Sequence, residues 1–98
     1  MSEMLVGPVL NDRAMFETVL EAAEIDNPGA ELSTEDQEGY FRIYAPRRLR
    51  LTRQSIEEAL GRPFKLSELE LYLSSFGGRM QSNSEEELVF YLEKGDEG

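Results

Sequence analysis

Paired acidic side chains are the residues of this sequence whose types and spacing could do chemistry. Two neighbouring carboxylates can divide the roles of general acid and general base, and such pairs occur at Glu57/Glu58, Glu68/Glu70 and Glu85–Glu87. The first two fall on predicted helices and the third in a predicted loop, without a nucleophile and base, a phosphate-binding loop or a metal-ligand spacing. Calcium would need acids alternating around a glycine turn, which Glu85–Glu87 lacks. We interpret these acids as solvated surface charges and name no catalytic residue.

The sequence contains no histidine and no cysteine. It therefore lacks the side chain that titrates near neutral pH, the thiol nucleophile, and the ligands that zinc, haem iron and iron-sulfur clusters prefer. We expect no cofactor, no metal site and no electron-carrying role. The start, MSEMLVGPVLNDR, shows no signal peptide, and no apolar segment reaches the roughly 18 residues of a membrane span. These observations indicate a soluble, cytoplasmic protein.

Length and charge limit the partners. A chain of 98 residues predicts a single domain over residues 1–98. Ten basic and twenty acidic residues give 10 − 20 = −10, which repels nucleic acid and anionic membranes and favours a protein partner with a basic or mixed surface. Five arginines cluster between positions 42 and 53: Arg42, Arg47, Arg48, Arg50 and Arg53. Such a cluster either keeps a sheet edge from aggregating, which we favour, or forms a docking patch.

Residues 74–78, SSFGG, have the composition of a binding surface. Two small polar residues and two glycines would let a partner's backbone approach closely, while the aromatic ring between them fills a pocket. A plain turn explains the same residues, and the residues alone favour the turn. The tyrosines offer rigid apolar area with a polar tip, although each one singly is typical of half-buried sheet packing: Tyr40, Tyr44, Tyr72 and Tyr91.

Apolar periodicity predicts the elements that would position these residues. Leu5–Leu10 is a short strand, and because Pro8 cannot donate to a sheet ladder we expect an edge strand or a bulge. A helix follows, capped by Asn11 or Asp12, and it ends near Ile25 because an Asn-Pro-Gly turn comes next. Its inward face repeats at i, i+3, i+4 and i+7: Phe16, Val19, Leu20 and Ala23.

The period changes to two between Glu31 and Thr52. Polar and apolar residues alternate over residues 40–44 and again over residues 48–52, and Pro46 with Arg47 marks a turn, so we predict a hairpin between these two strands. A second helix begins at Thr52 or Arg53. Gly61 stands where a left-handed residue would end it.

The segment Leu66–Phe76 fits two patterns. Ser67 and Glu70 match a capping box, whereas leucines alternate as in a strand, so we predict a short helix that unwinds into extended chain near Tyr72. Residues 80–92 form a hairpin over a polar loop, and residues 95–98 are predicted to be disordered. Helices and strands mix without strict alternation, which favours an α+β fold with three helices on a mostly antiparallel sheet.

Five segments in order resemble one known family. They are VGPV (Val6–Val9), EIDNPG (Glu24–Gly29), EDQEGYFRI (Glu35–Ile43), LTR with LGRPF (Leu51–Phe64) and LELYLSSFGGR (Leu69–Arg79). Each alone is weak, but five in order are specific. Over nearly the whole chain they resemble the coupling or effector (regulatory) proteins of soluble bacterial multicomponent diiron monooxygenases, and most closely the toluene 4-monooxygenase effector branch. The long N-terminal extension and C-terminal tail of methane monooxygenase regulatory proteins are absent.

The resemblance implies the monooxygenase effector-protein fold and a cofactorless protein that binds the α subunit of a diiron hydroxylase above its active site. There it would alter substrate access, iron-ligand geometry and oxygen activation, in a system that also includes a ferredoxin and a reductase and oxidises aromatic hydrocarbons or alkenes. In the methane branch two serines match Ser74 and Ser75 in a segment linked to substrate and oxygen access, whereas a smaller polar residue stands at Phe76.

From the resemblance and the residues together we expect a central contact on one segment and secondary contacts on two others. The expected partner-binding residues are Tyr72, Ser74, Ser75, Phe76, Gly77, Gly78, Asn27, Pro28, Gly29, Arg48 and Arg50. The alternative hypothesis is a generic acidic protein-interaction or ligand-sensing domain unrelated to oxygenases. A small stand-alone enzyme would need an active site that the sequence does not provide.

Overall fold

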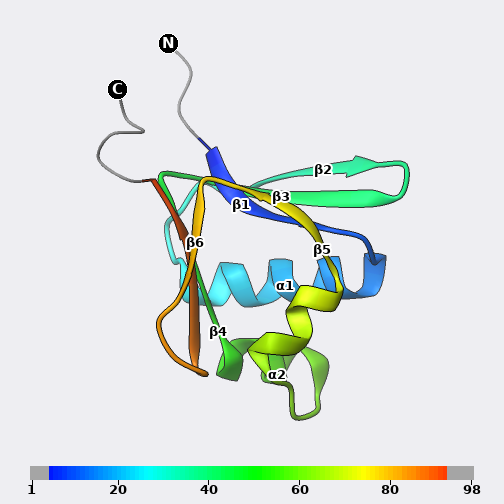
Figure 1. Cartoon of the computed structure of the whole chain (residues 1–98), viewed down its shortest axis with the longest axis vertical. Coiled ribbons are helices and arrows are strands. Elements are labelled where there is room, and N and C mark those ends of the chain that lie inside the picture. The colour runs from blue at the N-terminus through cyan, green and yellow to red at the C-terminus, as the bar shows by residue number, and fades with distance from the viewer. Residues whose placement is uncertain (1–4, 93–98) are drawn as a thin grey trace.

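Two antiparallel sheets, two α-helices and one 3-10 helix make up the computed structural model, which describes residues 5–92 (Figure 1). The elements in chain order are β1 (Leu5–Leu10), α1 (Arg13–Asp26), β2 (Ser33–Gln37), β3 (Tyr40–Pro46), β4 (Arg48–Thr52), α2 (Arg53–Leu60), the 3-10 helix η1 (Leu66–Leu71), β5 (Leu73–Gly77), β6 (Arg79–Ser82) and β7 (Glu87–Tyr91). The predicted α+β class is confirmed, with the strands divided between two sheets. Residues 95–98 lie outside the described residues.

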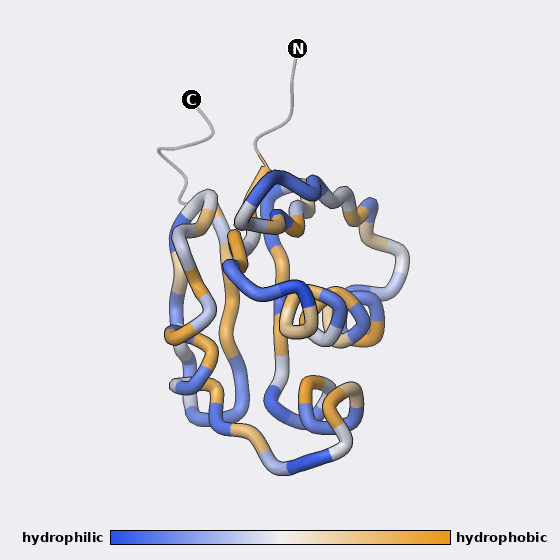
Figure 2. The backbone as a smooth tube through the Cα atoms, turned by 90° about the vertical axis from the view of Figure 1, so that its right-hand side faces the viewer, coloured by the Kyte–Doolittle hydropathy of each residue, from blue (hydrophilic) through white to orange (hydrophobic). Residues whose placement is uncertain are grey.

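The sheets contain four and three strands. Their orders are β2-β3-β1-β5 and β4-β7-β6. Helix α1 runs below the four-stranded sheet (Figure 1), where Phe16 stacks on Phe41 of β3 with the ring centroids 5.3 Å apart. Hydrophobic and hydrophilic stretches are interspersed along the backbone in Figure 2, and burial alternates from residue to residue along β3 and β4, as in half-buried strands. The hydrophobic residues form one core, whose largest fully buried members are Leu10, Ile43, Leu49, Leu51, Ile56, Leu69 and Phe90.

Both α-helices begin where their sequence signals predict. The Asp12 carboxylate accepts the N–H of Met15 at 2.9 Å, and the Thr52 hydroxyl accepts the N–H of Ser55 at 3.2 Å. Gly61 ends α2 in the left-handed conformation, with φ +76°. The predicted hairpin of β6 and β7 is also confirmed. These features are local, because each depends only on residues close in sequence to the helix end or to the hairpin loop.

Strand β1 is predicted to be an edge strand or to contain a bulge; it is a central strand, so the first alternative is wrong, and its irregular pairing confirms the second. It pairs with β3 on one side and with β5 on the other. Within the described strand, Val6 pairs with Ala45 and Val9 with Arg42, while Gly7 and Pro8 between them form no pair with β3. Gly7, at φ +146°, lies so close to β3 that a Cβ would stand 2.0 Å from the Ile43 carbonyl oxygen. This interruption admits a proline in mid-sheet, and the register with β5 also shifts between Val9 and Leu10, as a bulge does.

The predicted hairpin between β3 and β4 is wrong as well. Strand β3 pairs with β1 and β2, whereas β4 pairs with β7 in the other sheet. Arg47 stands between the two strands with φ +67°, and Gly78 between β5 and β6 has φ +82°. Both residues therefore turn the chain from the four-stranded sheet to the three-stranded one. The residues that follow them, Arg48 and Arg79, both pair with Tyr91 of β7.

The predicted change from helix to strand near Tyr72 is confirmed, because η1 ends at Leu71 and β5 begins at Leu73. The predicted capping pair, Ser67 with Glu70, is wrong. The Glu68 carboxylate accepts the backbone N–H of Lys65 at 3.0 Å. Since the helix begins at Leu66, Glu68 occupies the third position, where a glutamate can reach back to the residue before the helix.

Candidate partner-binding site

The predicted central contact lies on β5, an edge strand of the four-stranded sheet. Ser75 is opposite Val9, and both Ser74 and Ser75 are exposed. Phe76 is opposite Pro8 and is 42 % exposed, and its ring lies 5.9 Å from the ring of the fully buried Phe90. The edge strand therefore presents hydroxyl groups and part of one aromatic ring to solvent, and that ring rests on the core.

The two glycines after Phe76 make room for this chain's own strands. A Cβ at Gly78 would lie 2.5 Å from Val6 Cγ1 and 2.8 Å from the Tyr91 carbonyl oxygen, and a Cβ at Gly77 would lie 3.1 Å from the Leu5 carbonyl oxygen. Gly78 also needs its positive φ for the corner into β6. Within the fold, β1 and β7 approach the end of β5 closely at these glycines; the approach of a partner's backbone stays a prediction.

Asn27 is tied into the fold by its side chain. Its amide nitrogen donates to the carbonyl oxygens of Ala23 and Arg50 at 2.8 and 2.7 Å, and its amide oxygen accepts the Arg50 N–H at 2.9 Å. These bonds fasten the end of α1 to β4, a strand more than twenty residues away in the chain. Pro28 and Gly29, which follow, are exposed. Of this secondary contact, these two are exposed and Asn27 is half-buried.

Asp26 forms a second fastening that the sequence analysis missed. Its carboxylate accepts hydrogen bonds from the Thr52 N–H at 2.8 Å, from the Thr52 hydroxyl at 3.0 Å and from the Ser55 hydroxyl at 2.7 Å. An anion at the start of α2 is favourable because the first N–H groups of a helix carry partial positive charge. Asp26 is the last residue of α1, where the helix dipole disfavours a negative charge. An acid at such a position indicates that its side chain bonds to a residue outside the helix.

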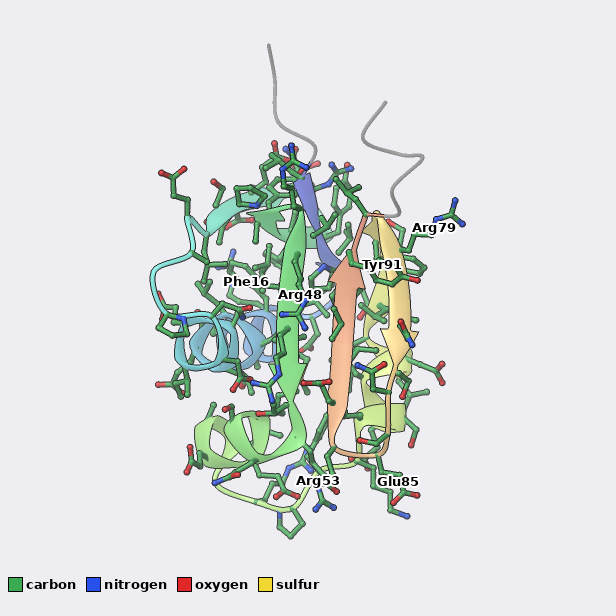
Figure 3. All side chains as sticks on the ribbon, turned by 90° about the vertical axis from the view of Figure 1, so that its left-hand side faces the viewer. Phe16, Arg48, Arg53, Arg79, Glu85 and Tyr91 are labelled. Atoms are coloured by element: carbon green, nitrogen blue, oxygen red, sulfur yellow. The ribbon has the colours of Figure 1, made fainter. Side chains whose placement is uncertain are left out.

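Arg48 and Arg50 lie on the outer face of the three-stranded sheet, which faces the viewer in Figure 3. The Arg50 guanidinium donates to the Glu87 carboxylate, and this contact lowers the pKa of Glu87. Asn83 donates to the other oxygen of the same carboxylate at 2.8 Å and lowers this pKa further. Arg48 is exposed, whereas the charge of Arg50 is already matched within the sheet.

The acidic pairs considered for chemistry are engaged in structural contacts. Glu57 accepts the N–H of Phe64 at 2.8 Å, Glu68 caps η1, and Glu86 pairs with Arg53 at 2.9 Å. Within residues 5–92 no group of three or more acids is arranged to hold a metal ion. Among the same residues, no helix is both long and apolar enough to cross a membrane.

Leu71 is an exposed apolar residue that the sequence analysis passed over. It ends η1 next to β5, and 75 % of its surface is exposed. In a 3-10 helix residues three apart share a face, so the buried Leu66 and Leu69 leave Leu71 pointing away from the core. That spacing could have identified it. Leu71 extends the exposed surface of β5 by one large aliphatic side chain.

The predicted contact residues therefore form two separate groups. Tyr72 to Gly78 run continuously along β5 and its end, with Tyr72 packed against the core and its carbonyl oxygen accepting the Asn11 N–H at 2.8 Å. Asn27 is bonded to Arg50, beside Arg48, on the other sheet. The structure brings together the members of each group, and it assigns the two groups to different sheets.

Comparison with known proteins identifies the family of this chain. Residues 4–91 match the model of the MmoB/DmpM family. The chain is 45 % identical over 91 residues to the effector subunit of the alkene monooxygenase system of Xanthobacter autotrophicus strain Py2, covering 93 % of this chain and 90 % of the relative.

Solved structures agree with the sequence match. Two chains described as phenol hydroxylase–regulatory protein complexes superpose with TM-scores of 0.74 and 0.70, at 29 % and 30 % identity, covering 91 % and 89 % of this chain and 99 % and 98 % of theirs. The regulatory protein B of soluble methane monooxygenase shares the fold, with a TM-score of 0.65 at 24 % identity over 97 % of this chain and 70 % of that one. The chain belongs to the MmoB/DmpM family, the family of monooxygenase effector and regulatory proteins that its five sequence segments resemble.

Proposed function

We propose that this protein is a non-catalytic, cytoplasmic effector that binds the α subunit of the diiron hydroxylase in a toluene-type or alkene-type multicomponent monooxygenase. There it tunes substrate access, oxygen activation and the coupling of NADH consumption to product, in a system completed by a ferredoxin and a reductase. The observation that carries the proposal is the family match over residues 4–91, together with a 45 % identical relative that is an effector subunit.

The chemistry of the chain supports an effect exerted through binding. A protein that brings no redox or acid-base group to the reacting atoms changes a partner's reactivity by binding two of its conformations unequally. Shifting a population from 1:99 to 99:1 takes about 5.5 kcal/mol of differential affinity. An interface of roughly 800 Å² per partner can supply this when it contains a few strongly contributing residues. One face of this molecule is therefore enough.

The surface of β5 is the contact we propose for the hydroxylase. It combines the exposed Leu71 and the half-exposed Phe76 with the hydroxyl groups of Ser74 and Ser75. Aromatic residues such as Phe76 are enriched in protein interfaces, and the small serines beside it leave room for a partner to cover the ring. Pro28, Gly29 and Arg48 would extend the contact only if the partner also reached the three-stranded sheet. Arg50 and Asn27 contribute indirectly, by holding that region in shape.

Turnover with and without the protein tests the function. Purified diiron hydroxylase, its ferredoxin, its reductase, NADH and oxygen are combined, and product formed per NADH consumed is measured as this protein is added. We expect both the rate and the yield per NADH to rise and to saturate near one effector per active site. An unchanged rate, yield and product distribution at saturating protein would end the proposal.

A matched pair of serine substitutions tests the surface. Ser75→Arg places a long cation on β5, and Ser33→Arg places the same cation on β2, the opposite edge of the same sheet, where Ser33 is also exposed. Surface changes of this kind usually alter stability by no more than about 0.5 kcal/mol. We expect Ser75→Arg to weaken hydroxylase binding at least about tenfold, equivalent to about 1.4 kcal/mol, and Ser33→Arg to leave it unchanged. Equal affinities for the two variants would remove β5 from the interface.

A further inference from the structure

A cavity lies between η1 and the hairpin of β6 and β7, apart from the outward surface of β5. Its volume is about 440 Å³. The lining residues come from α2, η1, β5, β6, β7 and the loop of the hairpin: Arg53, Lys65, Leu66, Ser67, Leu69, Glu70, Leu73, Met80, Ser82, Ser84, Glu85 and Leu88. Pockets that bind small molecules are typically about 300–1,000 Å³, so the volume is that of a ligand site.

The wall of the cavity is aliphatic. It includes four leucines and one methionine; Leu73 and Met80 are half-buried and present apolar surface to the cavity, whereas Leu66, Leu69 and Leu88 are buried and present almost none. Such a wall offers water few hydrogen-bond partners. The cavity is partly open to solvent, and a ligand that covers Leu73 and Met80 removes apolar surface from water. Its interior therefore suits an apolar body the size of one substituted aromatic ring.

The mouth of the cavity is polar and electrically balanced. Arg53 and Lys65 bring two positive charges, and Glu70 and Glu85 bring two negative ones. Arg53 and Glu85 both lie at the lower end of the molecule in Figure 3, and Arg53 is also paired with Glu86 at 2.9 Å. A ligand with a net charge would meet repulsion from one pair as well as attraction to the other. A neutral ligand meets neither.

Serine hydroxyl groups stand among these charges. Ser84 Oγ accepts the N–H of Glu86 at 3.0 Å, which leaves its own proton to be donated. Ser67 and Ser82 also line the cavity. A hydroxyl group on the ligand could both donate and accept here, so it would keep its hydrogen bonds on leaving water.

We propose that this cavity binds a small neutral alcohol or phenol, with its apolar body against Leu73 and Met80 and its hydroxyl group at the serines of the mouth. The site would be separate from the surface that contacts the hydroxylase. The proposal does not depend on the effector role, because it is carried by the shape and chemistry of the cavity alone.

Three related probes test the site on the full-length protein. Amide chemical shifts are followed by NMR during titration with p-cresol, with toluene and with p-toluate, which share a ring and differ in hydroxyl group and charge. We expect p-cresol to bind with a dissociation constant of about 1 mM or lower, as the small size of the probe allows, and to shift amides of η1, β5 and β6. Toluene should bind more weakly, and p-toluate at least tenfold more weakly.

The outcomes of the titration are distinct. No saturable shift with p-cresol, or shifts confined to other elements, would overturn the site. Equal affinity for p-toluate would overturn the requirement for a neutral ligand, and equal affinity for toluene would overturn the role of the hydroxyl group. A failed titration would leave the hydroxylase turnover assay unaffected, so the two proposals fail separately.

Filling the cavity gives the second test. Met80→Trp adds volume from a partly buried position on the wall, and the matched Leu71→Trp adds the same ring to the exposed side of η1. We expect Met80→Trp to reduce p-cresol affinity at least tenfold and Leu71→Trp to leave it unchanged. If Met80→Trp does not fold, Leu73→Phe fills the same space. A folded filling variant with unchanged p-cresol affinity would overturn the proposal.

Discussion

Strand β5 and the loop after α1 use their polar groups in opposite ways. On β5 the hydroxyl groups of Ser74 and Ser75 are exposed, on the edge of a sheet. In the loop, the amide of Asn27 makes three hydrogen bonds to backbone groups of α1 and β4. A polar group already bonded inside the protein must lose that bond before it can serve a partner. The first region is therefore available for recognition, and the second holds two elements in place.

The same distinction, between groups open to a partner and groups that hold the fold together, applies within β5 and its end. The serines and Phe76 offer surface, whereas Gly78 allows Val6 and Tyr91 to come close to the chain. One short segment can thus contain both contact residues and residues on which the fold depends. Substitutions of the two kinds should separate in the laboratory, because the first kind changes binding and the second changes stability.

The largest effect is expected at Gly78. Gly78→Ala forces a positive φ on alanine and places its Cβ 2.5 Å from Val6 Cγ1. Strain and overpacking each cost about 1–3 kcal/mol, so we expect a loss of about 3 kcal/mol or more in the free energy of unfolding, measured by urea denaturation. Gly39→Ala is the control, since Gly39 has φ +85° with open space around it, and should lose only about 1 kcal/mol. Equal losses would show that packing at Gly78 is unimportant.

Asn27 should give the next largest effect. Asn27→Ala leaves the backbone N–H and C=O of Arg50 without their side-chain partner, which costs about 2–3 kcal/mol for partly buried groups. The matched change at an exposed asparagine, Asn11→Ala, should cost much less. Affinity for the hydroxylase, measured where both variants are folded, should stay at the wild-type value. Weakened binding with unchanged stability would make Asn27 a contact residue after all.

The smallest effect is expected for the ion pair on the outer face. Arg50 and Asn83 lower the pKa of Glu87 in the folded protein. These contacts therefore stabilise the fold above the unfolded pKa of Glu87, about 4.3, and the stabilisation is lost as the pH falls through the lower folded pKa. Glu87→Gln should therefore be less stable than wild type at neutral pH, and the two unfolding curves should converge below about pH 4.

If the Glu87→Gln difference were independent of pH, the contact between Arg50 and Glu87 would contribute nothing measurable, as is common for exposed ion pairs.

Local chemistry predicted much of this fold. Asp12, Thr52 and Gly61 mark helix ends by hydrogen bonds and backbone conformations that involve only their near neighbours. The position of β1 could not be predicted in the same way. Pro8 alone favours an edge, and only the close passage of Gly7 against Ile43 shows how the middle of a sheet accepts it. Likewise, alternation predicts β3 and β4 as strands but does not say which strands they pair with.

The residues of the candidate site also differ in how far the sequence alone predicts their roles. Residues 74–76 are exposed on an edge strand, whereas the residues alone favour a plain turn at this place. The internal role of Asn27 depends on β4, which the chain reaches only after two further strands. In the sequence, an asparagine whose amide bonds to a distant backbone group looks the same as one whose amide is free to bind a partner protein.

Tyr91 gives the molecule a natural observation point. The first residues of β4 and β6 both pair with it, immediately after the two corners that link the sheets. The chain contains no tryptophan. An indole introduced at this position would be the sole emitter of its kind in the protein, and its fluorescence would report whether docking on one sheet changes the angle of the other.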